Sequence, residues 1–182
     1  MRFAEKFDKA KKEMEENKEQ KSLRVLTKRT IVEKVTVESK RTASESAICA
    51  VADFFCKLFK GTQVNGYGDK PLQLTNGNPV YYSFAVTIES YMGIVERDPS
   101  LVVVISNILL RICESIPAFE SVLLGKLMRS SQLLTMNEEK CAAFAKQLAA
   151  ADDRRVMLIP ETSAIKLFIN LHILGYYNIR AP

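Results

Sequence analysis

Four cysteines and one histidine are the side chains of this 182-residue chain best suited to bind a metal or attack a substrate. No two cysteines form a CxxC pair, and a single histidine cannot complete a cysteine–histidine zinc cluster. Each cysteine lies in an apolar helical pattern, which is typical of buried thiols in a reducing compartment. The histidine, His172, has no carboxylate near it in sequence, so we expect a core or partly exposed helix histidine. The cysteines are Cys49, Cys56, Cys113 and Cys141.

Acidic pairs could transfer protons only if the fold held them together in one cleft. Glu89 and Glu96 share one predicted helix, but one such pair does not indicate a catalytic site. The other pairs stand at predicted helix ends, where solvation and the helix dipole account for them. They are Asp152-Asp153 and Glu138-Glu139. We therefore expect no catalytic residue, no metal site and no enzyme activity.

Two groups of residues could bind a ligand or a partner instead. Lys57 and Lys60 end one predicted helix, and Arg111 lies near the end of another. If these ends converge, their cations could hold clustered phosphates; singly, each cation would balance a helix dipole. The second group is aromatic and could pack in the core or anchor an interface. It comprises Tyr81, Tyr82, Phe84 and Tyr91.

Composition limits the class of protein. Hydrophobic residues make up 47% and charged residues 26%, which suits one globular domain with a sizeable core. The net charge of +5 permits a polyanionic partner without demanding one. The N-terminus has no apolar signal core, and the longest apolar run, Leu101 to Leu110, is well short of the roughly 20 residues that span a bilayer. We expect a soluble protein, cytosolic or nuclear, without membrane insertion.

Hydrophobic spacing and helix-end signals predict helices along almost the whole chain. Residues 1–22 form a charged N-terminal helix, and 23–182 a single helical-repeat domain. The segment 23–37 is rich in β-branched residues and could be a strand, but its spacing and the lack of a nearby second strand favour a helix. The further predicted helices cover 44–60, 80–97, 100–114, 118–134, 138–151 and 160–174. The helix 100–114, apolar nearly all round, should lie at the centre.

The stretch from Gly61 to Pro79 is the one extended loop predicted. Its glycines fit neither a GxxxxGK[ST] nor a GxGxxG phosphate loop, so we expect a connector. Helices of about 15 residues joined by tight turns form antiparallel hairpins, the unit of HEAT-like solenoids. The predicted fold is all-α and HEAT-like.

A resemblance to a known family begins at residues 93–99, GIVERDP. An apolar helix, then Arg111-Ile112-Cys113 and Ile116-Pro117, follows them, and the interval from Pro99 to Cys113 has the family's spacing. This pattern resembles the C-terminal domain of the Gle-type mRNA export mediators, nuclear-pore proteins that stimulate the DEAD-box helicase of mRNA export. Residues 51–55 and 146–150 agree more loosely.

The resemblance implies a HEAT-like helical domain, in a shortened version, at the cytoplasmic face of the nuclear pore. It implies a DEAD-box mRNA-export helicase and nucleoporins as partners, with no direct DNA binding. It also implies a bound inositol hexakisphosphate, for which Lys57, Lys60 and Arg111 are the candidates. Ile112 and Glu114 stand where the family has a lysine and a proline, and a glutamate there weakens attraction for a polyanion.

Two other functions remain open from the sequence. The chain could be a general helical scaffold or adaptor in another complex, with Tyr81, Tyr82 and Tyr91 as candidates for contact with a partner. It could also be an RNA-binding helical module, although it has no RNA-reading motif and few aromatics among its basic residues.

Overall fold

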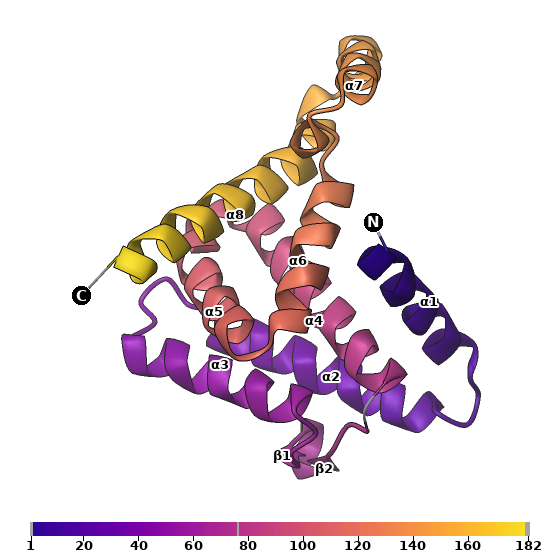
Figure 1. Cartoon of the computed structure of the whole chain (residues 1–182), viewed down its shortest axis with the longest axis vertical. Helices are drawn as coiled ribbons and strands as arrows, with labels where there is room; N and C mark the ends of the chain where they lie inside the picture. Colours follow the sequence, from indigo (N-terminus) through magenta and orange to yellow (C-terminus); the bar gives the residue numbers. More distant parts are fainter. Residues whose placement is uncertain (1, 76, 181–182) are drawn as a thin grey trace.

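The computed structural model describes residues 2–75 and 77–180, with side chains from 9 to 75 and from 77 to 175. Over this range it is all-α apart from one very small hairpin (Figure 1). The elements are α1 (Arg2–Glu16), α2 (Lys21–Glu38), α3 (Glu45–Phe59), β1 (Val64–Asn65), η1 (Tyr67–Asp69), β2 (Pro71–Leu72), α4 (Asn78–Arg97), η2 (Pro99–Leu101), α5 (Val102–Ser115), α6 (Pro117–Ser130), η3 (Leu133–Thr135), α7 (Glu138–Ala150) and α8 (Arg154–Arg180). The predicted fold class is confirmed, whereas HEAT-like repeats remain a prediction.

Helix α4, rather than α5, lies at the centre of the fold. Twelve of its residues are buried, and α1, α2, α6 and α8 all pack on it. In α5 six residues are buried, and Val103 on its outer side is 50% exposed. The prediction of 100–114 as the central helix is therefore wrong. An apolar outer face misled it, because hydrophobicity alone does not distinguish a face in the core from one left in solvent.

Aromatic side chains join the helices around α4. The Phe59 ring of α3 lies 4.7 Å from Phe84 of α4 and 5.4 Å from Phe119 of α6, between ring centroids. Phe84 and Phe119 also meet edge to face at 5.3 Å. Met14 of α1 belongs to the same core and is 1% exposed, so the charged N-terminal helix packs on the body of the domain by one edge.

Local signals set several helix ends as predicted. The Ser44 hydroxyl accepts a hydrogen bond from the Ala47 N–H at 3.2 Å and caps α3. Asn137 caps α7 in the same way through the Lys140 N–H, at 3.0 Å. Gly61 follows α3 with φ of 75°, the left-handed conformation that glycine adopts without strain, and so closes the helix.

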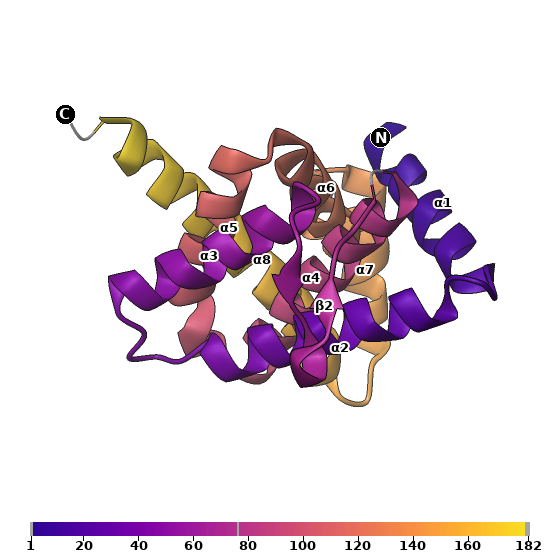
Figure 2. The ribbon, with the colours of Figure 1, turned by 90° about the horizontal axis from the view of Figure 1, so that it is seen from below.

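The predicted connector between α3 and α4 holds more order than expected. β1 and β2 pair antiparallel, Val64 with Leu72 and Asn65 with Pro71, and the three-residue turn η1 joins them. The hairpin lies against α2 and α3, as the view from below shows (Figure 2). Leu72 is 1% exposed and holds it to the core.

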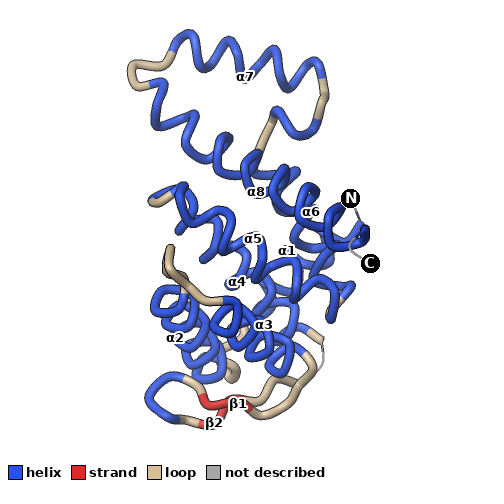
Figure 3. Tube along the Cα trace, turned by 90° about the vertical axis from the view of Figure 1, so that its left-hand side faces the viewer, coloured by secondary structure: helices blue, strands red, loops and turns tan. Residues whose placement is uncertain are grey.

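Helix α7 stands away from the other helices and packs on α8 and η3 (Figures 1 and 3). The predicted last helix, 160–174, is too short: α8 starts at Arg154, and Pro160 lies inside it. The Asp153 carboxylate accepts from the Arg155 N–H at 2.9 Å and so starts the helix earlier. The buried Glu161 then accepts from the Ser131 hydroxyl and the Gln132 N–H, which fastens α8 to the segment before α7.

One stretch of α8, Arg154–Gly175, is the only described segment long and apolar enough to cross a membrane by length and composition. In its most apolar 18-residue window, 28% of the residues are buried. The stretch contains no long uninterrupted apolar run, because Glu161 and Lys166 interrupt it. Core helices of soluble proteins pass the same test, so the stretch is weak grounds for a membrane span.

Candidate functional site: a groove along helix α2

The three cations predicted to hold a phosphate-rich ligand do not meet. Lys57 and Lys60 are exposed at the C-terminal end of α3. Arg111 forms an ion pair with Glu45, the first residue of α3. Glu45 and Lys57 are separated by about 18 Å of helix rise. The three residues therefore do not fit one inositol hexakisphosphate.

The cause is the direction in which the two helices pack. α5 lies against α3 with its C-terminal end beside the N-terminal end of α3, since Arg111 reaches Glu45. The two helix ends named from the sequence are thus opposite ends of one helix pair. Helix direction is a tertiary property, and residue spacing within either helix does not reveal it.

The predicted partner-binding tyrosines belong mostly to the core. Tyr82 is 3% exposed, Tyr91 is 0% exposed, and only Tyr81 is half-buried, edge to face with Phe84. Burial raises the pKa of Tyr82 and, more strongly, that of Tyr91, so both phenols stay neutral. Tyr82 and Tyr91 are therefore unavailable as interface anchors in this conformation.

Glu89, a candidate acid from the sequence, holds three helices together instead. The Lys11 ammonium of α1 donates to both its oxygens at 2.9 Å, and Lys126 of α6 donates to Oε1 at 2.8 Å. Burial raises the pKa of Glu89, but the hydrogen bonds from Lys126 and Lys11 outweigh burial and hold the pKa below its ordinary value. A carboxylate paired in this way serves the fold.

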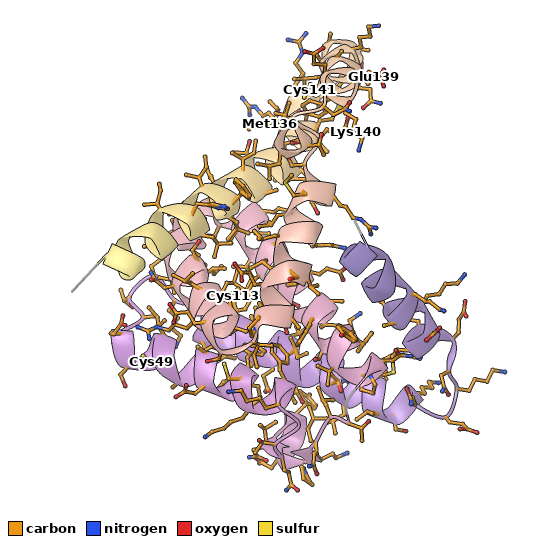
Figure 4. The ribbon with its side chains drawn as sticks, in the orientation of Figure 1. Cys49, Cys113, Met136, Glu139, Lys140 and Cys141 are labelled. Carbon is orange, nitrogen blue, oxygen red and sulfur yellow. The ribbon has the colours of Figure 1, made fainter. Side chains whose placement is uncertain are left out.

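The residues with metal or nucleophile chemistry are dispersed. Cys49, Cys113 and Cys141 lie on separate parts of the molecule (Figure 4). Cys113 is buried, and burial raises its pKa to about 12. His172 is exposed, with Nδ1 2.8 Å from the Phe168 carbonyl oxygen. Among the described residues, no three cysteine, histidine or acidic side chains are placed to share a metal ion.

A groove of about 680 Å³ follows the outer face of α2, and its lining is mainly apolar. Val25 and Val32 are each 41% exposed, and Val37 is 52% exposed. Val25 and Val32 stand seven residues apart on one side of α2, next to the buried Ile31 and Val35, which are 0% and 1% exposed. Val37 lies about 120–140° further round the helix. The apolar surface of the helix therefore extends from the core out into solvent.

The hairpin supplies the wall of this groove. The Tyr67 N–H donates to the Thr30 hydroxyl of α2 at 2.8 Å, and the Tyr67 ring is 42% exposed. The Arg29 guanidinium lies over that ring, 5.4 Å from its centroid. Gly66 approaches so closely that a Cβ there would lie 2.8 Å from the Thr30 hydroxyl oxygen. Glycine at this position lets the hairpin sit directly on α2.

A second hollow of about 700 Å³ continues the groove toward the start of α2. It shares Val25, Arg29 and Tyr67 with the first, so the two form one surface. Four cations and one carboxylate lie around the combined groove. They are Lys21, Lys28, Arg29 and Lys70, with Glu33. We call this surface the α2 groove.

Sequence reasoning missed the α2 groove, although one signal was present. The helical spacing of residues 23–37 grouped Val25 and Val32 with Ile31 and Val35 as one apolar set. On a helix of 3.6 residues per turn, positions 25 and 31 point about 120° apart, so Val25 lies to one side of the buried face. An apolar stripe that continues from the core into solvent leaves part of its surface for contact with a partner.

Comparison with known proteins identifies no relative. No protein-family model matches the chain, and no curated protein or solved structure matches it significantly.

Proposed function

We propose that this chain is a helical adaptor that binds a partner protein in the α2 groove. The observation that carries the proposal is the exposed pair Val25 and Val32 beside Tyr67, with Val37 in the lining of the same groove. Scattered exposed apolar side chains are ordinary, but apolar side chains that line one groove offer the geometry that binds an amphipathic partner helix. An aromatic wall with an arginine across it is typical of the centre of such interfaces.

Site-specific photocrosslinking in living cells tests the adaptor function. A benzophenone amino acid replaces Val32 in the groove or, as a control, Val103, which is 50% exposed on α5 and outside the groove. We expect one adduct of defined mass from position 32, lost when Val25→Asp is added, and none of that mass from position 103. Identical adducts from both positions, or none from position 32, would overturn the proposal.

The finer function, stimulation of the DEAD-box ATPase of mRNA export at the nuclear pore, is a second proposal. Its support is the residue pattern of 93–117, in which α4 ends at Arg97 before Pro99 and Cys113 stands near the end of α5. The test is RNA-dependent ATP turnover by the mRNA-export helicase of the same organism, with and without this chain. Faster turnover supports the proposal, and unchanged turnover together with no detectable complex refutes it.

A further inference from the structure

The charges around the α2 groove are strongly unequal. Lys21, Lys28 and Lys70 form no ion pair with any carboxylate in the described part of the chain, and Arg29 lies over Tyr67. Glu33 is the one acidic residue in the lining. The apolar floor of the groove, formed by Val25 and Val32, is thus bordered by more cations than carboxylates, although Lys28 also lines a neighbouring hollow that contains Glu15 and Glu89. A ligand that buries the floor would bring its own charges against this border.

We infer that the α2 groove binds an acidic amphipathic helix of a partner protein; this inference rests on the proposed adaptor function. Apolar side chains at positions i, i+3, i+4 and i+7 of such a helix would cover Val25 and Val32. Aspartates and glutamates on either side would reach Lys21, Lys28 and Lys70. From Lys21 to Val37 the helix rises about 24 Å, which matches a partner segment of about 16 residues.

The floor and the wall favour a peptide over a nucleic acid. A nucleic acid binds best where bases stack on free aromatic faces along an uninterrupted row of cations. Here Arg29 lies over the Tyr67 ring, the floor is aliphatic, and Glu33 stands among the cations. Pairing of two grooves from two copies of this chain is disfavoured too, because it would bring the same cations against one another.

The test uses fluorescence anisotropy with two designed helical peptides of about 16 residues. Both carry leucines at i, i+3, i+4 and i+7; one has glutamates on its flanks and its twin has lysines. We expect the full-length chain to bind the glutamate peptide at least about tenfold more tightly than the lysine peptide. The difference should shrink when salt is raised from about 50 mM to about 300 mM, because salt screens exposed charges.

Charge reversal supplies the decisive variants. Lys21→Glu combined with Lys28→Glu should reverse the preference, so that the lysine peptide binds more tightly. Lys57→Glu combined with Lys60→Glu makes the same charge change at the exposed end of α3, outside the groove, and should leave the preference intact. Val32→Asp should abolish binding of both peptides. Circular dichroism melting checks that each variant is folded.

The outcomes separate this inference from the adaptor function. Equal binding of both peptides, binding of neither, or equal loss in the control pair overturns the acidic-helix inference. Displacement of the glutamate peptide by an oligouridylate overturns it in favour of RNA. In each case a crosslinked partner at position 32 would leave the adaptor function standing. Loss of both the adduct and the peptide binding would refute both.

Discussion

Replacing Glu89 by glutamine should loosen the contact between α1, α4 and α6. Glu89→Gln keeps the size of the side chain but removes the charge that faces Lys11 and Lys126. The Glu89 side chain is 35% exposed, and the two lysines are 29% and 27% exposed. The pairs are therefore intermediate between exposed ion pairs, about 0.2–1 kcal/mol each, and hydrogen bonds to buried charges, about 1.5–3 kcal/mol.

About 1 kcal/mol for each lysine predicts a loss of about 2 kcal/mol in the free energy of unfolding. For a chain of this size that corresponds to a fall in Tm of about 4–8 °C. Urea denaturation followed by circular dichroism measures the loss directly. The control is Glu96→Gln on the same helix, because Glu96 is half-buried and has no ion pair with a described residue.

The loss should depend on pH in one direction. The folded-state pKa of Glu89 lies below its ordinary value of 4.5, so its contribution is complete above pH 4.5 and is lost as the pH falls through the folded-state pKa. The difference in unfolding free energy between the wild type and Glu89→Gln should be constant near neutral pH and shrink in acid. A difference below about 0.3 kcal/mol at pH 7, or one that grows in acid, would refute this account.

Two further perturbations follow from single contacts. Gly66→Ala should lower the free energy of unfolding by about 1–3 kcal/mol in urea denaturation, because the new Cβ would lie 2.8 Å from the Thr30 hydroxyl oxygen. The control Gly93→Ala, which has open space around it in α4, should be neutral or stabilising. Equal effects of the two substitutions would contradict this. Iodoacetamide should label Cys113 at least about tenfold more slowly than the half-buried Cys141, because burial raises the pKa of Cys113 to about 12. Equal labelling rates of the two cysteines, measured by mass spectrometry, would contradict the burial of Cys113.

Most helix positions could be predicted because their signals are local. A hydroxyl or amide side chain that accepts from an N–H three residues later starts α3 and α7, and a glycine ends α3. Pro160 misled the prediction of α8 because a proline suits the first turn of a helix, yet here Asp153 starts the helix earlier. Pro160 removes one backbone hydrogen bond from α8, but the packing of the buried face of this long helix keeps it continuous.

The candidate site could not be predicted because its geometry comes from distant segments. Val25 and Tyr67 meet in one groove through a hairpin that Thr30 and Gly66 hold in place. Arg111 pairs with Glu45 at the N-terminal end of α3, whereas a shared phosphate site with Lys57 and Lys60 would need it at the C-terminal end. Both outcomes depend on how helices and hairpin are placed in space, which spacing along one helix does not determine.

Helix α2 contributes different residues to the core and to the proposed binding surface. Ile31 and Val35 bury their side chains in the core, so substituting them should destabilise the domain. Val25 and Val32 are each 41% exposed, so exchanging either for a polar residue should cost less stability than exchanging Ile31 or Val35. Single exposed valines are ordinary, but two of them beside Tyr67 in one groove form a surface that suits a partner. This independence lets binding at the α2 groove be removed by substitution while the domain stays folded.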